Sequence, residues 1–283
     1  MTHPYLCRTA AIVLLTILSL SPGRAHAQER PFPYELSGQD GLIFPVGMAA
    51  GMLGLYMSSK TEPLTLAEIT ALDRQTVNGF DRGTTYNWSP TWQDRSDQPR
   101  NFLLISSVLL SGAPSFWRGE WSKTKTLATL FVEAASLTTA VTYMVKAIGS
   151  RARPYAYNTS LTPEERLAIV GPDDPSGHQS FISGHASSAF VAATLLSTIY
   201  ADVHGPTTTS KVIWASSLSL ASLTAYGRVK GGVHFPTDVM AGAAVGIAIG
   251  YLVPAIHRVD SGDRVSVSAG PGSVQLRLAV GGR

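Results

Sequence analysis

Apolar residues along the chain fall into blocks of helical length and not into alternating runs. Each block is bounded by Gly, Pro or charged residues, and this pattern predicts helices. The blocks are 42–57, 102–110, 126–146, 184–200, 212–229 and 237–256. They are rich in Ala, Ser, Thr and Gly, which suits close packing of helix against helix. We therefore predict an all-α fold, an antiparallel bundle of about six main helices.

Two stretches depart from this pattern. Ser58–Arg100 is polar and contains one segment of helical periodicity, Leu64–Phe80. Arg264–Val280 alternates around Gly-Pro-Gly, which predicts a β-hairpin-like tail. The chain thus divides into an N-terminal loop and helical segment (28–100), a helical core (101–257) and a β-like tail (258–283).

The first 27 residues are typical of an export signal. A weakly basic start precedes the apolar run Ala10–Leu20, and small residues at Ala25 and Ala27 fit cleavage before Gln28. An uncleaved anchor helix is the alternative, although the run is short for a full span of about 20 residues. We expect an exported protein of the cell envelope, membrane-associated or periplasmic.

The amino-acid composition limits the kinds of binding partner and chemistry that we expect. Charged residues make up 14% and apolar residues 45% of the chain, so little of its surface faces water. Removal of residues 1–27 takes away Arg8 and Arg24 and no acidic residue, which lowers the net charge from +3 to about +1. The basic pI is therefore no argument for nucleic acid binding. Cys7, the only cysteine, leaves with the signal, so the mature chain has no disulfide and no thiol chemistry.

The order of the core helices brings two loops to one end of the bundle. The helix ending at Lys146 enters a polar loop, 147–182, and the helix from Gly184 leaves it. The next helix returns and ends at Arg228, before a short loop, 229–235. If these helices pack antiparallel, basic residues, histidines and a carboxylate converge at this end.

The first block with chemical content is Lys146–Pro154. Lys146 and Arg153 offer a point charge and a planar fork, a good pair for a phosphate. Taken alone, the pair is more typical of cations that extend from the end of an apolar helix towards water.

The second block contains Ser-Gly-His twice, at 176–178 and 183–185. Ser183 can cap the helix that follows it, Gly184 allows the backbone to approach a ligand, and a helix N-terminus favours an anion. The first copy follows Asp173 and Asp174, which would repel a phosphate. We therefore assign the chemistry to His185 and place His178 on a surface loop.

The third block is Gly227–Gly242. Pro236 suits the first turn of a helix, from which Asp238 can reach back to His234. A carboxylate on one ring nitrogen fixes the tautomer and leaves the other nitrogen free as a nucleophile. An exposed His–Asp pair at a helix start is the alternative.

Taken together, K-x6-R-P, S-G-H and R-x5-H-x3-D resemble the type 2 phosphatidic acid phosphatase and vanadium haloperoxidase superfamily over about residues 126–256. Most members have Pro-Ser-Gly-His in the middle block, which here matches Pro175–His178, and position 182 is Ile instead of Pro. The small-residue helix that follows His185 still favours the second copy. Gly227 stands where the family often has Ser.

The resemblance implies a hydrolase with a phosphohistidine intermediate. Lys146, Arg153 and Arg228 would hold the phosphate oxygens, with Ser183 and the Gly184 amide completing the cradle. His234 would attack phosphorus, Asp238 would orient it, and His185 would protonate the leaving group. No metal or other cofactor is expected, because three basic side chains supply the electrostatics.

Several functions stay open at this point. An apolar bundle with its site at one end favours a phosphorylated lipid as substrate and association with a membrane. The alternatives are a soluble periplasmic acid phosphatase, favoured by polar positions such as Glu133, a vanadate-dependent haloperoxidase, and a non-catalytic lipid-binding protein. Topology raises a conflict, because a cleaved signal followed by three spanning segments would put the site on the cytoplasmic face.

Overall fold

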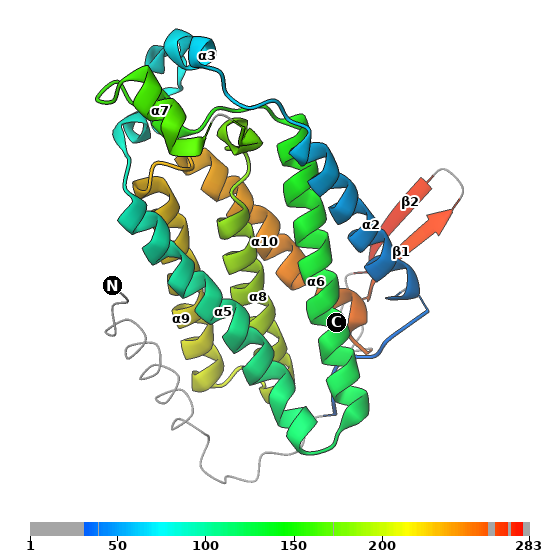
Figure 1. Ribbon diagram of the computed structural model, residues 1–283. Coiled ribbons are helices and arrows are strands. Elements are labelled where there is room, and N and C mark those ends of the chain that lie inside the picture. The colour runs from blue at the N-terminus through cyan, green and yellow to red at the C-terminus, as the bar shows by residue number, and fades with distance from the viewer. Residues whose placement is uncertain (1–30, 39, 172, 260–263, 271–272, 280–283) are drawn as a thin grey trace.

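The computed structural model describes residues 31–38, 40–171 and 173–259, together with two strands in the tail. The expected signal, residues 1–27, lies outside the described residues. Six long helices, of 20 to 28 residues each, build the protein (Figure 1). In chain order they are α2 (Asp40–Ser59), α5 (Pro90–Trp117), α6 (Trp121–Ile148), α8 (Gly184–His204), α9 (Thr208–Lys230) and α10 (Pro236–His257).

The predicted helical bundle is confirmed, with consecutive long helices running in opposite directions (Figure 1). The predicted number of helices was too low, because the described residues contain nine α-helices. The three additional helices are short: α3 (Leu66–Ala71), which lies within the expected helical segment, α4 (Gly79–Arg82) and α7 (Pro163–Val170). Together with four 3₁₀ turns (Arg74–Thr76, Gly83–Tyr86, Pro154–Tyr157 and Pro175–His178) they belong to the segments at one end of the bundle, where α3 and α7 form a cap (Figure 1).

The expectation of one helix over Leu64–Phe80 was wrong. Thr65 caps α3 with its side chain, Asp73 caps the turn at Arg74–Thr76, and Asn78 caps α4. Each of these side chains accepts a hydrogen bond from a backbone N–H that a continuous helix would have used internally. Three capping residues in 14 positions therefore divide the segment, although its apolar spacing is helical.

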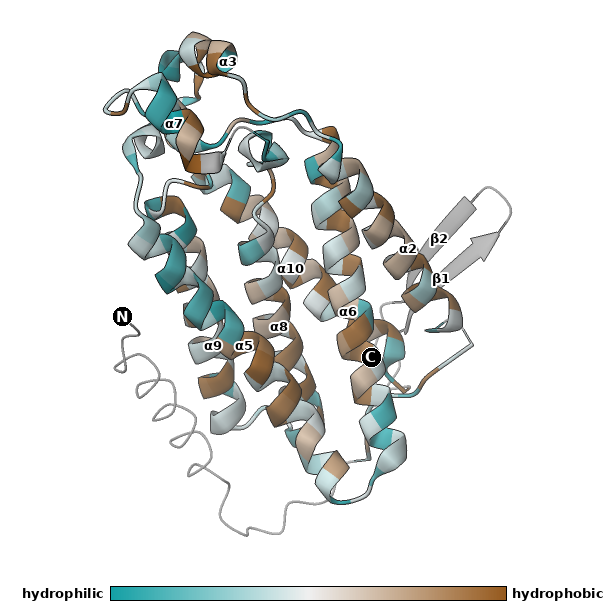
Figure 2. Ribbon diagram, in the orientation of Figure 1, coloured by the Kyte–Doolittle hydropathy of each residue, from teal (hydrophilic) through white to brown (hydrophobic). Residues whose placement is uncertain are grey.

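Helix α5 is much longer than its apolar block predicted. It begins at Pro90, with Ser89 as its cap, and continues through residue 100, where the sequence suggested a division of the chain. Its first half is polar and lies beside the cap, whereas its second half is apolar (Figure 2). The polar half contributes side chains to the site described below.

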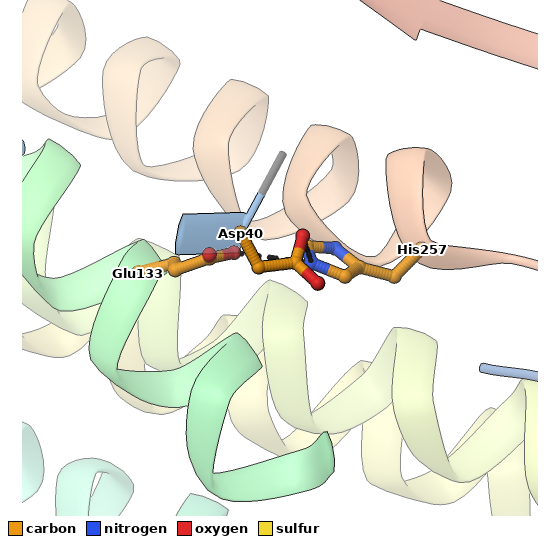
Figure 3. Close-up of side chains that lie close together, drawn as sticks. All are labelled: Asp40, Glu133 and His257. Atoms are coloured by element: carbon orange, nitrogen blue, oxygen red, sulfur yellow. Dashed lines mark ion pairs between the residues drawn. The ribbon is translucent and has the colours of Figure 1, made fainter. Parts of the chain in front are cut away.

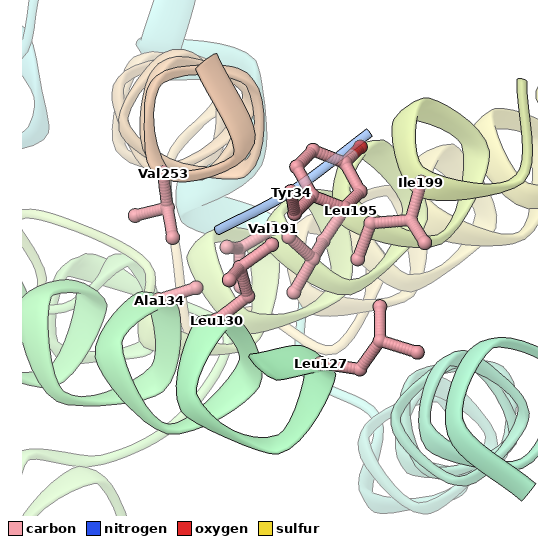
Figure 4. Close-up of a cluster of buried hydrophobic side chains, with 8 residues drawn as sticks. All are labelled: Tyr34, Leu127, Leu130, Ala134, Val191, Leu195, Ile199 and Val253. Atoms are coloured by element: carbon pink, nitrogen blue, oxygen red, sulfur yellow. The ribbon is translucent and has the colours of Figure 1, made fainter. Parts of the chain in front are cut away.

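The core between the helices contains mostly aliphatic side chains. One cluster, at the end away from the cap, joins α6, α8 and α10 to the N-terminal residue Tyr34 (Figure 4). Its members are Tyr34, Leu127, Leu130, Ala134, Val191, Leu195, Ile199 and Val253. A second cluster lies under the cap and joins Leu64 and Ile69 to Tyr155 and Val233.

Helices α8 and α10 approach closely along a line of glycines. A Cβ at Gly246 would lie 2.4 Å from the carbonyl oxygen of Ser187, and one at Gly242 would lie 2.5 Å from that of Ser183. Only glycine permits this separation of the two backbones. The close contact holds the first turn of α10 against the first turn of α8, where the site residues lie.

The tail holds two antiparallel strands, β1 (Arg264–Gly270) and β2 (Ser273–Ala279), with Arg264 paired to Ala279 and Gly270 to Ser273. The predicted connection at residues 271 and 272 lies outside the described residues, so the hairpin as a whole stays a prediction. The strands add little to a fold that is otherwise helical.

Four helices are long and apolar enough to cross a membrane: α2, α6, α8 and α10. Large apolar side chains are exposed on the outer surface of the bundle, including Leu42 and Met52 on α2, Ile105 on α5 and Met240 on α10. Apolar colour covers much of α2 and α10, whereas α7 in the cap is hydrophilic in its first half and apolar in its second (Figure 2). This distribution fits a membrane protein with a polar cap.

Candidate active site

The site lies at the capped end of the bundle, where α6 and α9 end and α8 and α10 begin. The loop after α6 and the short loop between α9 and α10 meet there, as the helix order predicted. Backbone hydrogen bonds join the two loops, because Tyr155 N–H donates to the Gly232 carbonyl (3.1 Å) and Ser183 N–H to the Asp238 carbonyl (3.0 Å).

Lys146 and Arg153 bind neutral oxygens and not carboxylates. Lys146 is buried, and its ammonium donates to the carbonyl of Gln179 (2.9 Å). The Arg153 guanidinium donates to the carbonyls of Ser176 (2.7 Å) and Val233 (3.3 Å). These contacts fix both side chains while leaving their positive charges uncompensated, an arrangement that favours an anionic ligand.

Arg228, the third predicted cation, has a similar environment. Its side chain is buried and donates a long hydrogen bond to the Ser96 hydroxyl (3.4 Å). Its Nε is buried and has no hydrogen-bond partner among the described residues. A buried donor without a partner is costly, and a phosphate oxygen would satisfy it.

His185 and Arg228 both contact Asp97, which lies in the polar half of α5. Nε2 of His185 is 2.8 Å from the Asp97 carboxylate, and Arg228 is 4.0 Å from the same oxygen. The charges of Arg228 and Arg153 also act on His185. Asp97 thus lies beside the imidazole that we predict to be the proton donor.

One ring nitrogen of His234 is engaged, and the other has no hydrogen-bond partner within residues 31–38, 40–171 and 173–259. Nδ1 lies 2.7 Å from the Ser180 carbonyl, which can only accept, so Nδ1 carries the proton and Nε2 retains its lone pair. Burial lowers the pKa of His234 well below its ordinary value, and the charges of Arg153, Lys146 and Arg228 lower it further. The ring is therefore neutral and nucleophilic near neutral pH, because burial and three nearby cations disfavour its protonated form.

The expected direct hydrogen bond from His234 to Asp238 is absent. The Asp238 carboxylate is 3.8 Å from Nδ1, and instead accepts from the Ser180 hydroxyl (2.5 Å) and the Phe235 N–H (2.8 Å). Asp238 therefore acts on the imidazole through Ser180, whose carbonyl holds the ring. Ser180 bridges the two groups, since its hydroxyl donates to Asp238 and its carbonyl accepts from His234.

Behind Asp238 lies a buried ionic network that the sequence did not reveal. Arg151 forms ion pairs with both Asp238 and Asp81, and its guanidinium lies 4.0 Å from the centre of the Phe235 ring. Asp81 also accepts hydrogen bonds from the backbone and hydroxyl of Thr237. Although burial raises the pKa of Asp81, its hydrogen bonds outweigh this effect and lower the pKa overall. The network anchors α4 and α10 to the loop that carries Arg153.

The first turn of α8 has the predicted form. Ser183 is buried, and its hydroxyl accepts from the Ala186 N–H (3.3 Å), so it caps the helix. Among the described residues, the Gly184 N–H donates to no protein acceptor. A Cβ at Gly184 would lie 3.3 Å from Thr142, which leaves little room beside this N–H for anything larger than glycine. A free N–H at a helix start is a suitable anion ligand.

The first Ser-Gly-His copy contributes through its backbone. It forms a 3₁₀ turn, Pro175–His178, whose Ser176 and Gly177 carbonyls bind the side chain and backbone of Arg153. The His178 ring faces Ser150 (3.3 Å) and Glu68 (3.8 Å), on the surface between the cap and the loop. The structure thus brings His185, and not His178, close to Arg228 and Asp97.

Asp97, Asp81 and Ser180 were missed by the sequence analysis. Arg151 was expected at this end of the bundle, because it lies two residues before Arg153 in the first block, but it was given no role. Asp81 and Asp97 carry no such signal, since each comes from a polar segment far from the motifs and meets the site only through the fold.

Comparison with known proteins finds a family match within the helical core. Residues 127–260, slightly less than half of the chain, match the sequence profile of the PAP2 superfamily. The matched region contains every predicted catalytic and phosphate-binding residue.

Two lipid A phosphatases of Porphyromonas gingivalis share part of this region. The chain is 35% identical over 81 residues to the lipid A 4'-phosphatase, covering 29% of this chain and 31% of that protein. It is 36% identical over 81 residues to the lipid A 1-phosphatase, covering 28% of this chain and 16% of that protein. The matched segment thus spans less than a third of either relative.

A solved structure also resembles the chain. The crystal structure of a transmembrane PAP2-type phosphatidylglycerolphosphate phosphatase from Bacillus subtilis aligns with a TM-score of 0.42 and 20% identity. The alignment covers 73% of this chain and 93% of that one.

Proposed function

We propose that the protein is a phosphatase that hydrolyses phosphate monoesters or diphosphates of membrane lipids through a phosphohistidine intermediate. One observation carries the proposal. Lys146 and Arg153 are held by backbone carbonyls, Nε of Arg228 has no partner among the described residues, and the charges of all three act on the buried imidazole of His234. Such an arrangement suits a tetrahedral anion.

In the first step, Nε2 of His234 attacks phosphorus in line with the ester oxygen. The P–N bond forms as the P–O bond to the leaving group breaks, and protonated His185 gives its proton to the departing alkoxide. Negative charge is spread over the three equatorial oxygens, where the three cations and the Gly184 N–H stabilise it.

In the second step, neutral His185 takes a proton from water while the water oxygen attacks phosphorus. The P–N bond breaks, inorganic phosphate leaves, and His185 is protonated again. Ser180 holds His234 in the correct tautomer throughout, and Asp97 holds His185.

A lipid substrate is favoured by the outer surface of the bundle. Exposed apolar side chains on α2, α5 and α10 continue to within a turn or two of the site end, at Tyr56 and Met240. Such a surface is unusual for a soluble protein and suits contact with acyl chains. This observation favours a lipid phosphatase over a soluble acid phosphatase.

The intermediate can be tested directly. Brief incubation with a ³²P-labelled lipid phosphate, followed by denaturation, should leave label on the protein that is stable to alkali and lost in acid, as expected for phosphohistidine. The label should be absent from His234→Ala and should accumulate in His185→Ala. Label retained in His234→Ala would refute the assigned nucleophile.

A substrate panel separates the competing activities. Phosphate release should be fastest from a phosphorylated lipid in mixed micelles (lipid A, phosphatidate, phosphatidylglycerophosphate or an isoprenyl diphosphate) and slower from a soluble aryl phosphate. Equal rates on both would favour the soluble acid phosphatase, and halide oxidation by the vanadate-loaded protein would favour the haloperoxidase.

We also propose that the protein is integral to a membrane of the cell envelope. The direction of α2 makes its sidedness testable. Asp40, at its start, lies beside His257 at the end of α10, whereas Ser58, at its end, accepts a hydrogen bond from Gln179 in the site loop. If the bundle crosses the membrane, residues 31–40 and the site therefore face opposite sides. Cleavage of an export signal at residue 27 would place residues 31–40 outside and the site inside. A site that faces outward is therefore incompatible with that cleavage.

Labelling with a membrane-impermeant maleimide can decide this question. In a Cys7→Ser background, Ser160→Cys would report on the site end and Ser122→Cys on the opposite end. Both positions are exposed. Reaction of only Ser160→Cys in intact cells would place the site outside, and reaction of only Ser122→Cys would place it inside.

A further inference from the structure

Far from the phosphate site, three ionisable side chains from three helices meet at one point (Figure 3). Asp40 begins α2, Glu133 lies near the middle of α6, and His257 ends α10. One ligand atom from each lies within 4.8 Å of the others. Glu133 is fully buried, His257 is 3% exposed, and the Asp40 side chain is 10% exposed.

The imidazole of His257 presents a lone pair to the two carboxylates. Its Nδ1 lies 2.7 Å from the Val253 carbonyl, so this nitrogen carries the proton. Nε2 is left facing Asp40 at 3.0 Å and Glu133 at 3.2 Å. A backbone carbonyl on one ring nitrogen is the usual way in which a metal-binding histidine is oriented.

No basic side chain other than His257 faces the two carboxylates in the described part of the chain, although Asp40 accepts hydrogen bonds from the Ser37 backbone N–H (2.5 Å) and hydroxyl (3.4 Å). Both oxygens of Glu133 and Nε2 of His257 are buried and have no hydrogen-bond partner among the described residues. In the described part of the chain, no Lys or Arg forms an ion pair with Asp40 or Glu133; Arg258, one residue after the cluster, pairs instead with Asp202. With a neutral imidazole, the group has a formal charge of −2, which a divalent cation would balance.

The spacing of the donors suits a metal ion. Bonds of about 2.0–2.2 Å from a metal to nitrogen and oxygen place neighbouring ligand atoms about 3.0–3.5 Å apart. The two distances from Nε2, 3.0 and 3.2 Å, fall in this range. One imidazole with two carboxylates is a donor set for a first-row ion such as Zn²⁺ and not for Mg²⁺, which prefers oxygen alone.

We propose that Asp40, Glu133 and His257 form a structural site for a divalent transition-metal ion, separate from the phosphate site. The ion would join the start of α2 to α6 and to the end of α10, and so fix the end of the bundle at which no cap is present. It takes no part in hydrolysis. The site also explains why a fully buried glutamate occurs within an apolar helix.

The test uses the tag-free, full-length protein in detergent, treated with chelator and then titrated with Zn²⁺. We expect one ion bound per chain, with a thermal midpoint of unfolding that rises on addition of Zn²⁺. Co²⁺ in place of Zn²⁺ should give visible d–d absorption. Glu133→Gln and His257→Gln should each weaken Zn²⁺ binding by about 100-fold or more, since even outer-sphere partners of a metal contribute about 10–100-fold.

Asp202→Asn is the matched control. Asp202 is a carboxylate at the same end of the bundle, paired with Tyr34 (2.6 Å) and Arg258 (2.8 Å), and lies outside the cluster. Its variant should bind Zn²⁺ like the wild type. If Glu133→Gln does not fold, the more accessible Asp40→Asn and the wild-type titration still decide the question.

The proposal is overturned if the chelated wild type binds no stoichiometric Zn²⁺ or Co²⁺, or if the cluster variants bind it as well as Asp202→Asn does. Either result would leave a triad in which a protonated His257 bridges two carboxylates. Phosphate release is measured in the same samples and bears only on the proposed hydrolase, so the two proposals can fail separately.

Discussion

The two ends of the bundle hold buried charge of opposite sign. At the capped end, Lys146, Arg153 and Arg228 bind mostly carbonyl and hydroxyl oxygens, so their positive charge is available to a ligand. At the other end, two carboxylates face one imidazole nitrogen without a Lys or Arg partner among the described residues. Ion pairs that are complete, such as Arg151 with Asp81, lie beside the site and hold it together. We therefore expect a ligand where the charge of buried side chains is incompletely neutralised, and a structural role where the ion pairs are complete.

The largest expected effect is a loss of hydrolysis that occurs when the capped end is changed and not when the opposite end is changed. His234→Ala removes the nucleophile, so lipid phosphate hydrolysis should fall by about 10⁴-fold or more. Folded Glu133→Gln, at the opposite end, should keep turnover within about threefold of the wild type, because surface and remote changes that preserve the fold leave chemistry intact. The measurement is phosphate release under saturating substrate. Similar losses in both variants would remove the distinction between the ends.

The two Ser-Gly-His histidines provide the next comparison. His185→Ala should lower kcat by about 10²–10⁴-fold, the usual contribution of a general acid–base group. His178→Ala should have little effect, because its ring faces Ser150 and Glu68 at the surface. The reverse ranking of the two variants would show that the first copy supplies the proton donor.

Loss of one uncompensated cation should be somewhat less severe. Arg153→Ala should lower kcat by about 10²–10³-fold, comparable to removal of one oxyanion-stabilising donor. Inhibition by vanadate should weaken in parallel, since the guanidinium would bind the analogue as well. Lys123→Ala, at the far end, serves as the control for an exposed cation. An unchanged vanadate affinity in Arg153→Ala would show that Arg153 does not contact the anion.

Asp238 should matter less than a carboxylate bonded directly to its histidine. Because it acts through Ser180, Asp238→Asn should lower kcat by about 100-fold, against roughly 10⁴ for a direct triad carboxylate. Ser180→Ala, which keeps the carbonyl that binds His234, should cost about tenfold. A larger loss in Ser180→Ala than in Asp238→Asn would contradict this order.

The smallest effect is a dependence of stability on pH at the site end. His234 has a lowered pKa in the folded state, so below its ordinary value of about 6.5 the unfolded chain binds a proton that the folded chain does not. Stability should therefore be complete above pH 6.5 and decrease as the pH falls, by at most about 1.4 kcal/mol per pH unit. Thermal unfolding of the phosphate-free protein measures this slope, and His234→Gln should reduce it. An unchanged slope would assign the effect to other groups.

Much of the bundle was predictable from the sequence, because apolar blocks of helical length and the motifs at their ends constrain each other. The parity of four helices was enough to place Lys146, Arg153, His185 and His234 at one end. The short helices were not predictable in this way. Capping by Thr65, Asp73 and Asn78 competes with helical periodicity, and the outcome depends on tertiary contacts under the cap.

The missed residues share a different cause. Asp97 and Asp81 meet the site from segments that are polar throughout, so nothing in their local sequence distinguishes them from solvated carboxylates. The local sequence around Asp40 and His257 does not predict their contact either. The two residues meet because the start of α2 lies beside the end of α10. Contacts of this kind are properties of the assembled fold.

The turn Pro175–His178 also has a consequence for how the enzyme can change. Its carbonyls position Arg153, and a Cβ at Gly177 would lie 2.7 Å from Cδ1 of Leu64, so a substitution there requires either the Leu64 side chain or the turn to shift. Substitutions in this surface loop can therefore change the affinity of Arg153 for the phosphate without altering His185 or His234. The first Ser-Gly-His copy, whose histidine has no predicted catalytic role, is therefore a position at which substitutions could change substrate affinity.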